Sequence, residues 1–295
     1  MASVCPKVLT ALLIGAPIVL AASAAPAHED YRKVGDGKIS DEPKVGYLFS
    51  CQQQFDPNAP GASEPGDWIV GKKFYPDLKP TVNGKVDWPD SRISIRVRGD
   101  ERVISANNLP SHKTGVYPIR SSDDAYDYDK NPNYIETQRI LLRLPANPEF
   151  AKQESCVPMG MIGFTVKGVA IYNAVDAKGR DAPAYEIQDK WGGHPQQSGQ
   201  YHYHDLAPGM SKGIDENGHS ELVGYALDGF GIYGEYEKKT DKKTRKMKNK
   251  KLDECHGHVG NVMWDGEEVE MYHYHLTTAY PYTIGCFRGP PVSVD

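Results

Sequence analysis

The sequence predicts a mainly β protein, with a β-sandwich-like domain of short strands and hairpins and an internal pseudo-twofold repeat. Helical periodicity is almost absent along the 295 residues. The chain also contains 29 glycines and 22 prolines, which interrupt it every few positions and favour many short strands. Three segments alternate apolar and polar side chains, as strands with one buried face do: Arg92–Arg98, Arg102–Ala106 and Gln138–Leu144.

Two further segments each indicate a β-hairpin. Ile162–Tyr172 has the pair Lys167-Gly168 at its centre, and Leu222–Tyr233 has Asp228-Gly229. A two-residue turn that ends in glycine favours a hairpin, because glycine adopts positive φ at little cost. After the second hairpin, Lys238–Lys251 holds eight lysines and one arginine, which we interpret as a solvated hairpin insertion, with a partner-docking patch as the alternative.

The chain opens with the layout of a secretory signal peptide over residues 1–27. Lys7 precedes an apolar run from Val8 to Leu20, and small residues follow it, with cleavage expected after Ala24 or Ala27. The run is shorter than the ~20 residues that a membrane-spanning helix needs. We therefore expect a periplasmic or secreted protein that is not an integral membrane protein once the signal is removed.

Four cysteines follow the signal segment, an even number that indicates two disulfides in an exported protein. The sequence does not choose among the three pairings. We favour Cys255 with Cys286 and Cys51 with Cys156, and free or metal-ligating thiols are the alternative. The formal net charge of −5 argues against nucleic acid as a partner, and the sequence predicts no particular protein partner.

An internal repeat organises the C-terminal half of the chain. Three blocks recur in the same order: 163–172 with 224–233, 188–194 with 252–258, and 201–204 with 272–275. Convergent turn chemistry accounts for the first block but not for the other two. We expect two similar β units, 161–208 and 222–288, packed about a pseudo-twofold axis with equivalent histidines facing each other. They belong to one domain over 88–290, preceded by an N-terminal extension over 28–87.

The last block of the repeat is the tetrapeptide Tyr-His-Tyr-His. On a strand it places two imidazoles on one face and two phenols on the other. One chance copy is expected in roughly one of a thousand such sequences, and this chain has two. Neutral imidazole is the commonest metal ligand, and copper and zinc both accept it. The candidate ligands are His202, His204, His273 and His275, followed by His258 and His194. The alternative is a metal-free ladder of histidine and tyrosine that stabilises a sheet.

Carboxylates accompany both repeats. Asp189 and Asp253 are equivalent, and Glu186, Asp228 and Glu254 lie close by in the sequence. We expect these carboxylates to orient a histidine through its second ring nitrogen or to act as a general base, except for Asp228, which we expect to serve the hairpin turn. Asp253 and Glu254 are the candidates for a catalytic base. His219 and His256 lack repeat partners, so we expect them at the surface or in turns.

These motifs together resemble the YHYH protein family, which is named for the tetrapeptide. Beyond the repeated blocks, the resemblance rests on Asn108-Leu-Pro-Ser-His112, where Leu109 replaces the usual glycine, and on Tyr280–Gly289. It extends from about residue 91 to residue 290. The resemblance implies an exported bacterial protein and adds His112 as a seventh candidate ligand, but it implies no particular activity.

Three functions follow as hypotheses. The first is an exported metal-binding protein that holds copper or zinc between the two repeats. The second is a metal-dependent hydrolase or oxidase, with water on an open coordination position. The third is a metal-free module that binds a surface or cell-wall ligand. Motifs for a serine nucleophile, a phosphate loop, a dinucleotide or an EF-hand are absent from the sequence.

Overall fold

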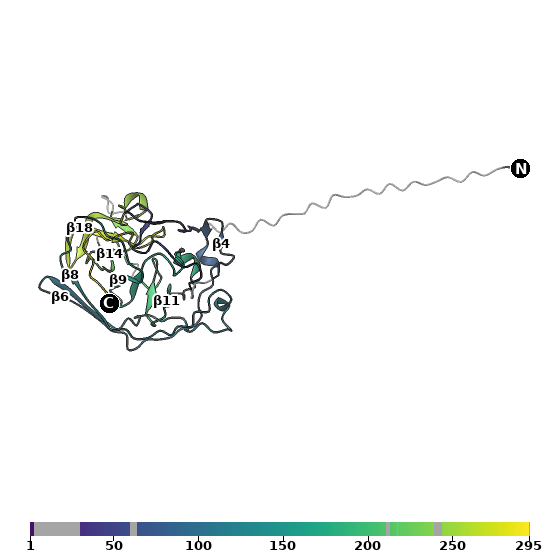
Figure 1. Ribbon diagram of the computed structural model, residues 1–295, viewed down its shortest axis with the longest axis horizontal. Helices are drawn as coiled ribbons and strands as arrows, with labels where there is room; N and C mark the ends of the chain where they lie inside the picture. Colours follow the sequence, from purple (N-terminus) through teal and green to yellow (C-terminus); the bar gives the residue numbers. More distant parts are fainter. Residues whose placement is uncertain (3–29, 60–63, 211–212, 217, 239–243, 295) are drawn as a thin grey trace.

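The computed structural model shows a mainly β protein, as predicted (Figure 1). It describes residues 1–2, 30–59, 64–210, 213–216, 218–238 and 244–294. All but the first two residues of the predicted signal peptide lie outside this part of the chain. Within it, no helix is long and apolar enough to span a membrane.

An eight-stranded sheet forms the centre of the molecule. Its strands are β9 (Met161–Thr165), β10 (Ala170–Tyr172), β11 (Gly193–Pro195), β12 (Tyr201–Tyr203), β13 (Leu222–Ala226), β14 (Gly231–Tyr233), β17 (Gly257–Trp264) and β18 (Glu267–His275). They are ordered β11-β12-β10-β9-β13-β14-β18-β17. In Figure 1 the labelled strands β18, β14, β9 and β11 follow one another across the body in this order.

Both predicted hairpins are confirmed. β9 pairs with β10 and β13 pairs with β14, in each case antiparallel. Gly168 and Gly229 occupy the turns with φ of 87° and 90°, a backbone region that glycine enters without the steric penalty of a Cβ atom. β9 and β13 then pair with each other and join the two hairpins at the middle of the sheet.

The two halves of the sheet have the same pairing pattern. In the first half, the outer strand of the hairpin, β10, pairs in parallel with β12, and β12 pairs antiparallel with the edge strand β11. In the second half, β14 pairs in parallel with β18, and β18 pairs antiparallel with the edge strand β17. A twofold axis relating the halves stays a prediction. The order has one direct consequence: the two tetrapeptide strands, β12 and β18, lie five strand spacings apart, about 24 Å along the sheet.

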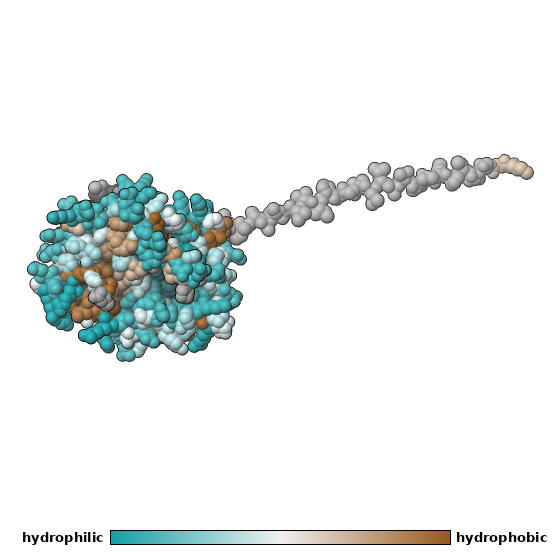
Figure 2. Space-filling model, in the orientation of Figure 1, coloured by the Kyte–Doolittle hydropathy of each residue, from teal (hydrophilic) through white to brown (hydrophobic). Residues whose placement is uncertain are grey.

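A three-stranded antiparallel sheet covers the central sheet. It contains β6 (Ile93–Arg98), β7 (Glu101–Ala106) and β8 (Ile140–Pro145), close to the three strands expected from alternation. Ile104, Leu142 and Leu144 from this sheet share one core with Ile162, Phe164 and other residues of the central sheet. The outward side chains Val97 and Leu141 are exposed. Figure 2 shows a mostly hydrophilic face, with its largest brown area on the side where Figure 1 places β6 and β8.

The remaining elements are short. They are β1 (Arg32–Lys33), β2 (Ile39–Ser40), β3 (Leu48–Phe49), β4 (Ile69–Val70), β5 (Lys73–Phe74), β15 (Tyr236–Lys238), β16 (Thr244–Lys246), α1 (Ala182–Tyr185) and three 3₁₀ turns, Pro76–Leu78, Asp124–Asp127 and Asn249–Lys251. β15 and β16 form a hairpin at the predicted basic insertion, of which residues 239–243 lie outside the described chain.

Residues 30–59 and 64–87 pack onto the rest of the described chain. Trp68 donates its indole N–H to the carbonyl of Ala184, and the backbone at Val82 pairs with that at Asp189. Leu48 is fully buried in the main core. These contacts describe a packed N-terminal segment, while a domain boundary at residue 88 stays a prediction.

The expected disulfide pairing is confirmed. Cys51 is bonded to Cys156, and Cys255 is bonded to Cys286. The first bond ties the N-terminal segment to the segment before β9. The second ties the turn before β17 to the C-terminal loop. Disulfides of this kind are compatible with a secreted or periplasmic protein.

Candidate metal centres

The histidines gather in two clusters rather than in one. The N-terminal cluster consists of Glu186, His194, His202 and His204, and the C-terminal cluster consists of His219, Glu237, His258, His273 and His275. Both groups of buried imidazoles and carboxylates could hold a metal ion. The expectation of one centre shared between the repeats is therefore wrong. The strand order is the reason, because four other strands separate β12 from β18.

Strand geometry assembles the imidazoles of the N-terminal cluster. His202 and His204 project from the same face of the chain at β12, and the β11–β12 ladder places His194 directly opposite His202. Tyr201 and Tyr203 project to the other face and are buried in the main core. The alternation predicted for the tetrapeptide is thus present, with imidazoles on one face and phenols on the other.

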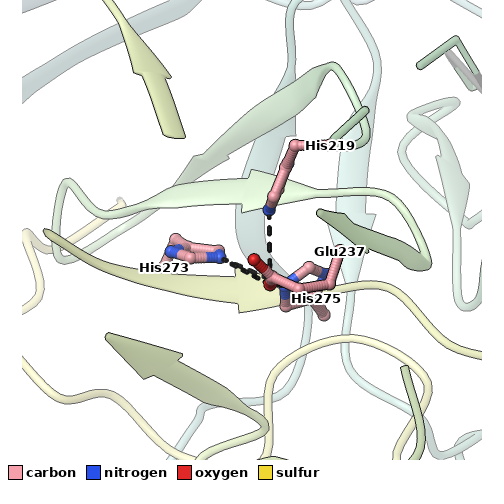
Figure 3. A group of neighbouring side chains, drawn as sticks. All are labelled: His219, Glu237, His273 and His275. Carbon is pink, nitrogen blue, oxygen red and sulfur yellow. Dashed lines mark hydrogen bonds and ion pairs between the residues drawn. The ribbon is translucent and has the colours of Figure 1, made fainter. Parts of the chain in front are cut away.

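The C-terminal cluster uses the same framework and adds a residue. His258 lies opposite His273 in the β17–β18 ladder, and His275 follows two residues later. His219 reaches the cluster from the segment before β13, and Glu237 reaches it from β15 (Figure 3). Four imidazoles and one carboxylate therefore point toward one another.

Backbone carbonyls fix which ring nitrogen faces each cluster. A carbonyl oxygen only accepts, so an Nδ1 atom within hydrogen-bond distance of one must carry the proton. The pairs are His202 with Gln200, His204 with Asn173, His219 with Ser220, His273 with Met271 and His275 with Gly234, at 2.5–3.2 Å. In the neutral imidazole the Nε2 atom then has a free lone pair, and this atom points to the cluster.

The Nε2 atoms lie unusually close together for a metal-free site. They are 3.0 Å apart between His202 and His204, and 3.1 Å apart both between His273 and His275 and between His258 and His275. Two lone pairs at this distance repel unless a proton or a cation lies between them. Ligand nitrogens about 2.1 Å from one ion lie about 3.0 Å apart at right angles and about 3.4 Å apart at the tetrahedral angle. The spacing fits shared coordination.

A buried carboxylate completes each cluster. Glu186 Oε2 lies 3.2 Å from His194 Nε2 and 3.1 Å from His204 Nε2. Glu237 Oε2 lies 2.8 Å from His258 Nε2, 3.4 Å from His275 Nε2 and 3.6 Å from His219 Nε2. Both Oε2 atoms are buried without a hydrogen-bond partner, as are Nε2 of His194 and Nε2 of His219. Buried polar atoms seldom lack partners, so these atoms are available to coordinate an ion.

Electrostatics point the same way. Burial opposes the charged carboxylates, but His194 and His204 outweigh it and hold the pKa of Glu186 well below its usual value. The pKa of Glu237 is likewise lowered, because the neighbouring imidazoles outweigh burial. Burial and neighbouring imidazoles lower the pKa of His202 and His273. Burial opposes the charged form of His204, but Glu186 outweighs it and raises the pKa of this imidazole. Each cluster thus holds an ionised carboxylate, the form in which a carboxylate binds a metal ion, among closely spaced imidazoles.

The comparisons with known proteins agree with the tetrapeptide. Residues 141–250 match the family model described as YHYH protein. This stretch of the chain is similar to the YHYH protein family. Searches of curated proteins and of solved structures returned no match. The matched stretch includes the N-terminal cluster with the first Tyr-His-Tyr-His, and it ends before the second.

The two equivalent aspartates bind tyrosines rather than histidines. Asp189 accepts hydrogen bonds from the phenol of Tyr201 at 2.9 and 3.0 Å, and Asp253 accepts one from the phenol of Tyr272 at 3.0 Å. Both also accept backbone N–H groups of the turn that follows them. The expectation that they orient histidines is wrong, because both aspartates lie on the side of the tetrapeptide strands to which the tyrosines project.

Two further candidates lie outside the clusters. Glu254 lies 3.7 Å from the guanidinium of Arg288, so neither proposed catalytic base touches the imidazoles. His112 bonds through Nε2 to the phenol of Tyr203 and stacks on Trp191 with ring centroids 6.0 Å apart. It therefore belongs to the tyrosine face of the first tetrapeptide strand.

Both unpaired histidines are buried rather than at the surface, and His256 lies in a turn, as expected. His219 is 1% exposed and joins the C-terminal cluster. His256 is 2% exposed and takes φ of 74° in the turn before β17, where its ring lies 3.1 Å from the hydroxyl of Thr277. Burial lowers the pKa of His256 to about 3. The absence of a repeat partner was thus no guide to exposure.

Sequence reasoning named Glu186 only as a carboxylate near the first repeat, and it missed Glu237 and His219 as cluster members. A gap-free extension of the hairpin block places Asp176 at the position of Glu237, and Pro158 at the position of His219. Asp176 instead pairs with Arg180. The N-terminal carboxylate comes from Glu186, after α1, where the ammonium group of Lys79 bonds the carbonyls of Pro183 and Glu186. The sequence repeat therefore predicted only those cluster members that lie on the strands of the two ladders.

Proposed function

We propose that this protein is an exported metal-binding protein that holds copper or zinc in its two histidine clusters. The observation that carries the proposal is the convergence of Nε2 atoms whose Nδ1 partners are backbone carbonyls. This arrangement sets the tautomer that imidazole ligands need before any ion arrives. The residues that would hold an ion are those of the two clusters.

The donor set supports ions of the copper and zinc class. Imidazole nitrogens with one carboxylate suit divalent ions of intermediate softness, whereas thiolates and thioethers would favour copper(I). All four cysteines after the signal segment are engaged in disulfides, so none competes as a ligand. A bound ion would relieve the repulsion between adjacent Nε2 atoms and partner the buried Oε2 atoms of Glu186 and Glu237.

Two observations support export. The apolar segment after Lys7 has the length and the flanks of a cleaved signal. Both disulfides need an oxidising compartment in order to form and persist. An exported metal-binding protein would meet its ion outside the cytoplasm.

Metal content is the direct test. The full chain, purified from the compartment to which it is exported, should contain copper or zinc by elemental analysis. After treatment with a chelator, added Zn²⁺ or Cu²⁺ should raise the melting temperature. An ion present at a hundred times its Kd stabilises the folded state by about 2.7 kcal/mol per site.

The double variant His204→Ala, His275→Ala should bind less metal and lose much of its metal-dependent stabilisation, because both clusters lose a shared imidazole. The matched control is His112→Ala, which removes a histidine outside the clusters. A double variant with unchanged metal content and unchanged melting temperature would overturn the proposal and favour the metal-free binding module. Turnover of a hydrolytic or oxidative substrate only in the metal-loaded wild type would favour the enzyme hypothesis.

A further inference from the structure

The two clusters differ in the number of donors that converge. Three imidazoles and one carboxylate meet in the N-terminal cluster, and four imidazoles and one carboxylate meet in the C-terminal cluster. His219 makes the difference. Its ring centroid lies 5.2 Å from that of His273 and 5.3 Å from that of His275, and its Nε2 atom is buried without a hydrogen-bond partner.

The two clusters also differ in the orientation of a tyrosine that occurs in both copies of the repeat. Tyr172 and Tyr233 are equivalent in the hairpin block. Tyr172 stacks face to face on His202, with ring centroids 3.8 Å apart and planes 22° from parallel. Tyr233 instead stands edge-on to His273, at 5.2 Å and 74°, and also contacts His219 edge-on. In the N-terminal cluster the tyrosine ring therefore packs flat against an imidazole. In the C-terminal cluster the equivalent tyrosine stands edge-on and contacts the fourth histidine, His219.

Ligand number has a direct consequence for affinity. A structural zinc ion takes four ligands, so the four donors of the N-terminal cluster are all required to fill its shell. The C-terminal cluster has five donors and keeps four when one is lost. The fourth imidazole also adds a neutral donor without adding charge that must be buried.

We infer that the two clusters form two separate and unequal ion sites, and that the C-terminal site fills first. This inference rests on the proposed function, since it assumes that the clusters bind metal. It goes beyond it by assigning the stoichiometry, the order of filling and the residue responsible, His219. The chain would carry one tightly held ion and one that exchanges more readily.

The test is a titration of the metal-free full chain with Zn²⁺ alone, in competition with a chromophoric chelator of known affinity. Two steps of one ion each are expected, with dissociation constants at least about 10-fold apart, which is the scale on which changes in supporting ligands alter metal affinity. His204→Ala should abolish the weaker step and leave the tighter one unchanged.

His219→Ala should weaken the tighter step by about 10–100-fold, so that the two steps merge. His219→Gln keeps much of the side-chain volume and serves as the second variant if the alanine variant misfolds, as judged by near-ultraviolet circular dichroism. His112→Ala should leave both steps unchanged.

The outcomes separate the inference from the proposed function. Two ions bound with equal affinity, a single ion per chain, or a tighter step that survives both His219 variants would overturn the inference while leaving metal binding intact. No Zn²⁺ binding and no Cu²⁺ binding at all would overturn the proposed function itself.

Discussion

The N-terminal and C-terminal clusters are built on the same strands but completed differently. In both, a tetrapeptide strand supplies two imidazoles and an antiparallel edge strand supplies a third opposite the first. The same backbone positions hold the rings, since Asn173 and Gly234 are equivalent and accept from His204 and His275. The carboxylates and the fourth histidine come from segments that do not correspond. The ladder is the same in both halves, and the segments outside it make the two clusters unequal.

Removing the imidazole that makes the shortest Nε2–Nε2 contacts in a cluster, His204 or His275, should have the largest effect on metal binding. His204→Ala should lose the ion of the N-terminal cluster, whereas His275→Ala leaves four donors behind and should weaken ion binding at the C-terminal cluster by about 10–100-fold. At a free ion concentration a thousand times Kd, the loss in His204→Ala removes about 4 kcal/mol of metal-dependent stabilisation. Elemental analysis and melting temperatures with and without Zn²⁺ measure this. Loss of both ions from either single variant would contradict two independent sites.

The equivalent aspartates should differ in their effect on acid stability. Burial raises the pKa of Asp189 from 3.8 to about 6, so the folded state binds a proton more tightly than the unfolded chain does. Its contribution to stability is complete below about pH 4 and is lost as the pH rises through about 6, about 3 kcal/mol in total. Asp189→Asn should flatten this part of the stability profile.

Asp253→Asn is the matched comparison for that experiment. Burial also raises the pKa of Asp253, but its side chain is 25% exposed, so a smaller flattening is expected. Urea unfolding of the metal-free protein at several pH values between 4 and 7 checks both variants. A larger effect at Asp253 than at Asp189 would show that burial does not control these carboxyl groups.

Neutralising the two cluster carboxylates should test whether the C-terminal cluster has a spare donor. Glu186→Gln and Glu237→Gln should each weaken ion binding at their own cluster by about 10–100-fold, because glutamine keeps the size but not the charge. The effect should be larger for Glu186, since Glu237 leaves four imidazoles behind. Competition titrations with Zn²⁺ measure both, and equal losses would argue against a spare donor in the C-terminal cluster.

The smallest effects are expected from the repeated tyrosines. The phenol of Tyr233 donates to the carbonyl of Met263 at 2.8 Å, and that of Tyr172 donates to Gln200 Oε1 at 2.5 Å. Tyr233→Phe and Tyr172→Phe should each cost about 1 kcal/mol of stability. Ion stoichiometry should stay at the wild-type value, because neither hydroxyl faces the cluster Nε2 atoms. A change in stoichiometry would mean that these phenols act directly on the ion.

Much of the framework was predictable because it rests on local chemistry. Gly168 and Gly229 lie in turns that are specified by a few neighbouring residues. The alternation of tyrosine and histidine from Tyr201 to His204 follows from the pleat of a strand. The disulfide pairing was favoured correctly among three alternatives. The cluster members that were missed, His219 and Glu237, lie in an irregular segment and in a short strand, where no periodicity marks which way a side chain points.

The sequence by itself determined a β protein with paired cysteines and two strands that each carry alternating histidines and tyrosines, because these properties depend on residues close together along the chain. Only the tertiary structure decided that the two tetrapeptides serve separate clusters. That outcome depends on strand order, which places four strands between β12 and β18. Strand order is set by which hairpins pair at the centre of the sheet, and a repeat in sequence is equally compatible with one shared centre or with two.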